Sequence, residues 1–177
     1  MKLLLHGCCA DCSLKFLESI KENKDIDEVD IYYYNPNIHP RSEYVSRLEA
    51  MQKICKETGT KLIIPDWSPK EYFKIQNPGA TTEKERCPKC WDLRLGKTTM
   101  FAKEKGYEYF SSTLVTSQYQ NQVAIRKIAQ KWEKETGVKF FEPEKVCCEL
   151  ETKGFYKQFF CGCVYSMKER FEEKYQV

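Results

Sequence analysis

The sequence His6-Gly7-Cys8-Cys9-Ala10-Asp11-Cys12-Ser13 joins two segments of different pattern, and the fold follows from how they are joined. Before it, residues 2–5 form a short apolar run typical of a buried β-strand, and after it residues 14–20 have the spacing of a helix. Open α/β sheets bind ligands in loops of this kind, which leave the carboxyl end of a strand and enter a helix. A helix N-terminus also favours thiolates, so the thiols of this loop predict a site built from sulfur.

Strand-like and helix-like segments alternate along the rest of the chain. We expect further strands at 28–34, 61–65, 109–114 and 139–141, and helices at about 42–58, 67–76, 83–105 and 121–135, followed by a final charged helix. This order predicts an α/β fold with one parallel sheet and helices on both faces. We expect a single domain over residues 1–177, with a cysteine-rich helical segment at about 143–177.

The composition is that of an ordinary globular protein. With 41% hydrophobic and 31% charged residues the chain is not disordered, and its net charge of +3 permits a nucleic-acid partner without requiring one. The apolar run after Met1 is too short for a signal peptide, and no run approaches the roughly 20 residues that span a bilayer. We therefore expect a cytoplasmic protein with no membrane partner, in which clustered cysteines serve metal or redox chemistry.

Eight of the ten cysteines form close pairs, at Cys8/Cys9, Cys87/Cys90, Cys147/Cys148 and Cys161/Cys163. A Cys-x-x-Cys spacing at the start of a helix places both sulfurs on one face, and Pro88 fits the first turn of that helix. Together with Cys8-Cys9 in the strand-end loop, this pair indicates a multi-thiolate metal site. We favour an iron–sulfur cluster, because adjacent thiols diverge too far for one tetrahedral ion, and zinc is the alternative.

Three further sites each have two interpretations, and a fourth is expected to be structural. Cys161-Gly162-Cys163 can close a small strained disulfide ring that cycles with its dithiol, or it can supply extra metal ligands. Asp11 is a helix-capping carboxylate or an oxygen ligand for a second metal ion. Arg94 shares the helix face of Cys87 and Cys90, where it can neutralise an anionic cluster or form a surface ion pair. Cys55 lies on an apolar helical stripe and is expected in the core.

Five motifs carry a resemblance to a known family. They are His6-Gly7-Cys8-Cys9-Ala10-Asp11-Cys12; Tyr34-Asn35-Pro36-Asn37-Ile38-His39-Pro40 with Glu43-Tyr44 and Arg47; Arg86-Cys87-Pro88-Lys89-Cys90-Trp91 with Arg94-Leu95; Ser112-Thr113-Leu114 with Ser117-Gln118; and Phe155-Tyr156-Lys157-Gln158 with Cys161-Gly162-Cys163. With these motifs the sequence resembles the epoxyqueuosine reductase QueH family over essentially its whole length. It departs from many relatives at Asp11, where they carry proline.

The resemblance implies reduction of the epoxide of epoxyqueuosine, at the wobble position of a tRNA, to the alkene of queuosine. It implies a [4Fe–4S] cluster on Cys8, Cys9, Cys87 and Cys90, and a redox-active disulfide between Cys161 and Cys163. It also suggests an additional iron, for which Asp11 and Cys12 are the nearest ligands. The catalytic candidates are therefore Cys161, Cys163 and Asp11, and the partners are the tRNA and an electron donor that the sequence does not identify.

The family is also similar to the adenine-nucleotide-binding PP-loop/HUP-like α/β folds. This chain lacks their Ser-Gly-Gly pyrophosphate loop, so we expect no nucleotide hydrolysis. The same absence argues against a cluster-dependent tRNA sulfur transferase, and a zinc-binding RNA-interaction module is the other alternative. Epoxide removal as water consumes two protons, for which the candidate relays are Asp11, Thr113, Ser117 and Tyr156. The basic residues expected to flank the site and contact phosphates are Arg41, Arg47, Lys84, Arg86 and Lys89.

Overall fold

The computed structural model describes residues 1–76, 82–117, 119–144 and 154–176. At its centre is a five-stranded sheet in the order β3-β2-β1-β4-β5, in which every pairing is parallel. The strands are β1 (Lys2–His6), β2 (Glu28–Tyr32), β3 (Lys61–Ile63), β4 (Tyr109–Ser112) and β5 (Lys139–Phe140). The predicted α/β fold with a parallel sheet is confirmed.

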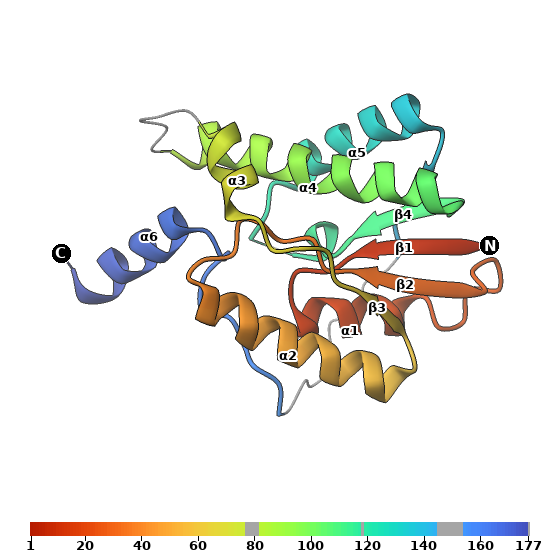
Figure 1. The fold of residues 1–177 in the computed structure, drawn as a ribbon, viewed down its shortest axis with the longest axis horizontal. Helices are drawn as coiled ribbons and strands as arrows, with labels where there is room; N and C mark the ends of the chain where they lie inside the picture. The colour runs from red at the N-terminus through yellow and green to blue at the C-terminus, as the bar shows by residue number, and fades with distance from the viewer. Residues whose placement is uncertain (77–81, 118, 145–153, 177) are drawn as a thin grey trace.

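Helices cover both faces of the sheet (Figure 1). On one face lie α1 (Ala10–Ser19) and α2 (Arg41–Thr58), and on the other lie α4 (Glu83–Lys105) and α5 (Gln122–Thr136). Beyond the carboxyl ends of the strands lie α3 (Pro69–Ile75) and α6 (Val164–Tyr175), and a 3-10 helix, η1 (Thr113–Thr116), follows β4 directly. In the part of the chain that is described, no helix is both long enough and apolar enough to cross a membrane.

The central strand β1 is buried on both faces, which explains its continuous apolar sequence. Leu3 and Leu5 point to the side of α1 and α2, whereas Leu4 packs on the opposite side with residues of α4 and α5. All three are fully buried. Cys55 lies in the core cluster of the first side and is 6% exposed, so the prediction that it is a core residue is confirmed.

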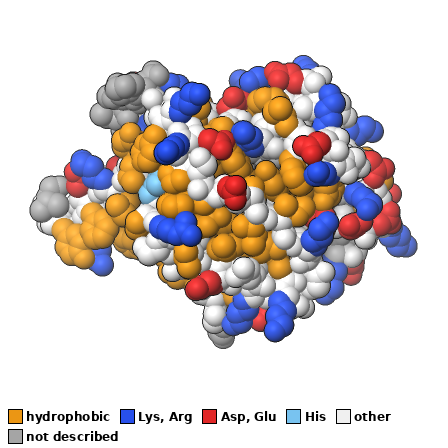
Figure 2. Space-filling view, viewed as in Figure 1, with side chains coloured by type: hydrophobic (Ala, Val, Ile, Leu, Met, Phe, Trp, Pro, Cys, Tyr) orange, Lys and Arg blue, Asp and Glu red, His pale blue; other side chains and the backbone are white. Residues whose placement is uncertain are grey.

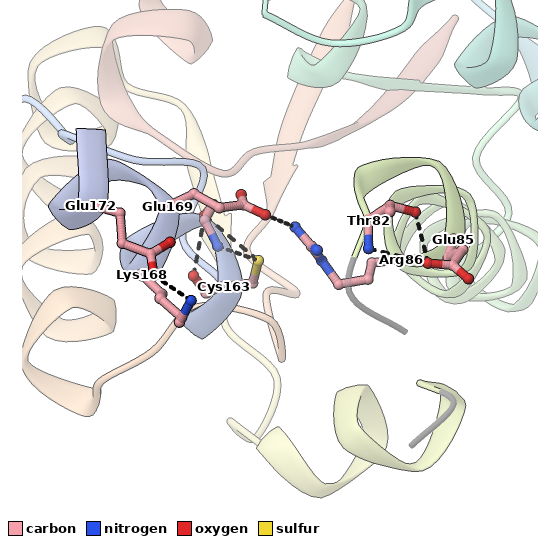
Figure 3. A network of polar contacts seen from close by, with 8 residues as sticks. Thr82, Glu85, Arg86, Cys163, Lys168, Glu169 and Glu172 are labelled. Carbon is pink, nitrogen blue, oxygen red and sulfur yellow. Dashed lines mark hydrogen bonds and ion pairs between the residues drawn. The ribbon is translucent and has the colours of Figure 1, made fainter. Parts of the chain in front are cut away.

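Two predictions near the site differ from the structure. The strand expected at 109–114 ends at Ser112, because the Ser112 hydroxyl accepts a hydrogen bond from the Leu114 amide (3.2 Å) and starts η1. The prediction that Pro88 lies in the first turn of its helix is wrong. Thr82 and Glu85 form a capping box at the start of α4, which begins at Glu83 as predicted, so Pro88 lies beyond the first turn (Figure 3). Pro88 is therefore inside the helix, where it cannot donate to the carbonyl of the preceding turn.

Candidate functional site

A cavity of about 400 Å³ lies beyond the carboxyl ends of β1 and β4. Its thiols come from two distant parts of the chain, namely Cys8, Cys9 and Cys12 from the start of α1, and Cys161 from the segment before α6. Thr113 and other residues of η1 and the turn after it line the wall between them. The loop after β1 therefore lies where a ligand site of an open α/β sheet is expected.

The thiol loop is held close to the sheet, and Gly7 is what permits this. A Cβ at Gly7 would lie 2.9 Å from Cγ2 of Ile31 and 3.1 Å from Cε of Met51, so any side chain would push the loop outward. The Gly7 carbonyl also accepts a hydrogen bond from the side-chain amide of Asn35 (2.8 Å). On the next residue, the Cys8 amide donates to Oγ1 of Thr113 (3.3 Å), and the Cys8 sulfur lies 3.4 Å from the same oxygen.

The second thiol pair lies on α4, one and two turns into the helix. Cys87 is half-buried, and Cys90 is 8% exposed and packs with Tyr72 and Cys163. Arg94 follows Cys90 by one turn and is only 1% exposed, so the alternative of a surface ion pair is wrong. Its Nη1 lies 4.0 Å from the Cys90 sulfur.

Arg94 is surrounded by neutral partners and thiols. It donates from Nη2 to Oδ1 of Asn35 (3.0 Å), and its Nε lies 3.3 Å from Nε2 of His6. The same His6 nitrogen lies 3.1 Å from the Tyr34 carbonyl, but one tautomer can serve only one of these partners. Since Arg94 can only donate, we assign the proton of His6 to Nδ1, which then donates to Oγ of Ser112 (2.8 Å).

Charge at the site depends on these neighbours. Burial and the adjacent Arg94 guanidinium hold the pKa of His6 well below its usual range, so its imidazole is neutral. Burial alone would lower the pKa of Arg94, but the thiols of Cys90, Cys8 and Cys161 raise it, so the guanidinium remains charged. Arg94 is therefore a buried cation that faces sulfur from both thiol segments.

The thiols resist ionisation in the protein alone. The hydrogen bond that the Cys8 thiol donates to Cys9, together with burial, raises the pKa of Cys8 well above its usual range, and a hydrogen bond with Cys12 raises that of Cys9 to about 12. Burial raises the pKa of Cys90 to about 12, and burial together with the charge of Cys161 raises that of Cys87. Such thiols become thiolates when a cation binds them, because its charge offsets both burial and their mutual repulsion.

The Cys161-Gly162-Cys163 segment is anchored by backbone contacts. Arg47 donates to the carbonyls of Cys161 (3.1 Å) and Phe160 (2.8 Å), and the Gly162 carbonyl accepts from the His39 amide (2.7 Å). Gly162 has φ +124°, and a Cβ there would lie 3.0 Å from Cγ1 of Ile38 and 3.3 Å from Nη1 of Arg47. Only glycine fits this position without strain.

The two cysteines of this segment have different surroundings. Cys161 is exposed and lines the cavity, whereas Cys163 is 8% exposed and lies at the N-cap of α6. The Cys163 sulfur accepts a hydrogen bond from the Ser166 amide (3.4 Å). Both are free thiols in this structure.

Two arginines that were expected to contact phosphates have structural partners instead. Arg47 and Arg86 are each 2% exposed, which contradicts a role in presenting charge to solvent. Arg47 pairs with Glu43 (2.6 Å), which also accepts a hydrogen bond from the Tyr156 hydroxyl. Arg86 pairs with Glu169 (2.5 Å), which ties α4 to α6 (Figure 3). The Glu43–Arg47 pair has the i,i+4 spacing of a helix, but the contacts of Arg47 with Phe160 and Cys161 and the Arg86–Glu169 pair join residues that are far apart along the chain, so spacing could not reveal them.

The remaining predicted site residues do not line the cavity or are not described by the structure. Asp11 forms an ion pair with Lys15 one turn along α1 (3.1 Å) and is not among the residues that line the cavity. It lies in the first turn, and the N-cap of α1 is Cys9, which contradicts capping, one of the two interpretations of Asp11. Cys147, Cys148 and Gln118 lie outside the described residues.

The arrangement of the described ligands bears on the kind of metal. Within residues 1–76, 82–117, 119–144 and 154–176, no three His, Cys, Asp or Glu side chains form a group that could hold one ion. Around a tetrahedral zinc with bonds of about 2.3 Å, the sulfurs would lie only about 3.8 Å apart. In a cluster the ligands bind separate irons, so their sulfurs lie farther apart. The candidate ligands on α4 and in the loop after β1 are thiols, which are soft donors suited to iron–sulfur clusters and to zinc.

The sequence matches the family model described as Epoxyqueuosine reductase QueH over residues 3–169, which include every described thiol of the site. A curated protein of that name from Dehalococcoides mccartyi is 43% identical, and the alignment covers 96% of this chain and 94% of that protein. The proteins of the same name from Haemophilus influenzae and Thermotoga maritima are 34% and 31% identical, over 95% and 99% of this chain. These alignments cover 72% and 95% of the two proteins.

Proposed function

The chain belongs to the epoxyqueuosine reductase QueH family, and it is an oxidoreductase of queuosine biosynthesis that converts epoxyqueuosine to queuosine; we propose that it does so on a tRNA, with a [4Fe–4S] cluster held by Cys8, Cys9, Cys87 and Cys90. The observation that carries this proposal is the buried Arg94, which faces Cys90 and acts electrostatically on Cys8. A buried guanidinium among thiols is stabilised by anionic sulfur, and thiolates are the ligands that iron–sulfur clusters require.

The reaction needs two electrons and two protons to remove the epoxide oxygen as water. A [4Fe–4S] cluster, when bound, supplies electrons one at a time. The thiols of Cys161 and Cys163 can supply both electrons and both protons, because closing their disulfide releases two of each. The products are then the alkene, water and the disulfide. Cys161 lines the cavity, and Cys163 is at the N-cap of α6. An electron donor must afterwards reduce the disulfide.

A proton relay is available from the wall of the cavity. Thr113 and Ser117 both line it, and Oγ1 of Thr113 also contacts the Cys8 sulfur. Tyr156 is less suited, because its hydroxyl is engaged by Glu43. We assign the relay to Thr113, which would pass on the protons released by the Cys161 and Cys163 thiols.

The proposed additional iron would use Cys12 and Asp11. An iron with an open position acts as a Lewis acid on oxygen. Cys12 lines the cavity, and Asp11 would have to exchange its contact with Lys15 for the metal. We propose this position as the second iron site, which makes Asp11 a ligand rather than a proton donor.

The test is turnover of a tRNA that carries epoxyqueuosine by anaerobically reconstituted protein. Mass spectrometry of the digested tRNA should show loss of one oxygen atom from the modified nucleoside. Cys87→Ser and Cys90→Ser should lose cluster and turnover together, because hydroxyl is a poor ligand for iron in place of thiolate. The matched control is Cys55→Ala, a cysteine in the core away from the cavity. Full iron and full turnover in both serine variants would overturn the ligand assignment.

A further inference from the structure

The rim of the thiol cavity carries large aromatic side chains that the fold leaves exposed. Tyr119, between η1 and α5, is 77% exposed, and Phe159, shortly before Cys161, is 59% exposed. Both belong to the lining of the cavity that contains Cys8, Cys9 and Cys12. Figure 2 shows hydrophobic side chains gathered at the end of the molecule where α6 lies. Exposed aromatic surface next to an active-site cavity is typical of a binding surface.

The size of the cavity limits what can enter it. Small-molecule pockets measure roughly 300–1,000 Å³, so the 400 Å³ found here accommodates one modified nucleobase but not the remainder of an RNA loop. Enzymes that act on a base commonly take that base out of its stack and into a pocket. The nucleotides on either side of the base must then rest on the rim, where the two rings lie.

Charge on the rim is largely neutralised within the protein. Arg170 pairs with Glu173 (2.7 Å), and both line the cavity. Glu169, also in the lining, pairs with Arg86. With a net charge of only +3 for the whole chain, the protein can neutralise few phosphates. Contacts with the bases must therefore supply much of the affinity for RNA, and aromatic stacking supplies such contacts for any base sequence.

We propose that Tyr119 and Phe159 stack on the unpaired anticodon-loop bases that flank the wobble nucleotide. The two rings hold the loop at the rim while the modified base enters the cavity toward Cys161. The Lys174 ammonium group lies 5.7 Å from the centre of the Phe159 ring and adds positive charge beside this contact. The inference rests on the proposed function, since it assumes that the cavity receives the wobble base.

The experiment compares two RNA probes with the same number of phosphates. One is an anticodon stem–loop with an unpaired loop, and the other is a fully paired duplex. Tyr119→Leu and Phe159→Leu should each weaken binding of the stem–loop roughly 5- to 150-fold, and should leave binding of the duplex unchanged. The ring-retaining variants Tyr119→Phe and Phe159→Tyr should bind the stem–loop like the wild type. So should Phe171→Leu, which removes a ring that is 51% exposed on α6 but does not line the cavity.

Three results would overturn the inference. The leucine variants could bind the stem–loop as tightly as the wild type, or they could lose stem–loop and duplex equally. They could also bind both RNAs normally and lose only the turnover that a protein electron donor supports, which would make the rim a docking surface for that donor. The binding assay requires no turnover. If cluster-loaded wild type left epoxyqueuosine unchanged while the leucine variants still lost stem–loop binding, the proposed function would fail and the stacking surface would stand.

Discussion

Replacement of Arg94 by methionine should weaken cofactor binding far more than it weakens the fold. At the 4.0 Å that separates Nη1 of Arg94 from the Cys90 sulfur, unit charges attract by about 4 kcal/mol at an effective dielectric constant of about 20. This attraction exists only when the sulfur is a thiolate, so it stabilises the loaded protein and not the protein with neutral thiols. The expected loss for the loaded form is up to about a thousandfold in the binding equilibrium.

The same replacement should reduce the stability of the metal-free protein by less than it reduces cofactor binding. In Arg94→Met, Oδ1 of Asn35 is left buried without this donor, which costs about 1–3 kcal/mol, but removal of a buried charge offsets part of that cost. Arg94→Lys keeps the charge and loses the forked geometry, so it should give an intermediate result. The assays are anaerobic loss of iron to a chelator and urea unfolding of the metal-free proteins. If Arg94→Met lost iron no faster than the wild type, the electrostatic reasoning would be refuted.

The remaining predictions concern the redox pair, the anchored glycine and the packing of α4. Cys161→Ser and Cys163→Ser should retain iron and sulfide but lose turnover. Oxidised wild type should have two fewer titratable thiols than its reduced form. Loss of iron in both variants would instead identify the two cysteines as metal ligands. Gly162→Ala should slow turnover without removing the cluster, because its φ of +124° and its contacts with Ile38 and Arg47 oppose a side chain; turnover at the wild-type rate would contradict this. Gly96→Ala should lower the free energy of unfolding by about 1–3 kcal/mol, because its Cβ would lie 2.4 Å from the Trp132 ring. Its iron content should be unaffected. An unchanged urea midpoint would show that α4 and α5 can separate freely.

Local pattern was sufficient to predict the sheet and the position of the thiol loop. The apolar run of β1, followed directly by Cys8 and Cys9, required only the rule that ligands bind beyond strand ends. The error at Pro88 was also avoidable, since the helix was expected to begin at Glu83, and the Thr82-x-x-Glu85 spacing is a capping signal for that start, which places Pro88 beyond the first turn.

Long-range pairs could not be predicted in this way. Arg47 reaches the carbonyl of Cys161, which is 114 residues later, and its own charge is neutralised by Glu43 one turn earlier. Nothing in the spacing of these residues shows that a basic side chain is buried rather than offered to a phosphate. The same holds for Arg94, whose partners His6 and Asn35 come from separate strand ends.

The central claim is that thiols from the β1–α1 loop and from α4 hold an iron–sulfur cluster. The most direct measurement is the iron, zinc and acid-labile sulfide content of anaerobically purified wild type, read together with its absorption spectrum. The account predicts about four irons and about four sulfides per chain, or one iron more when the additional site is filled, with broad absorption near about 400 nm. Colourless protein that contains one zinc and no sulfide would contradict it.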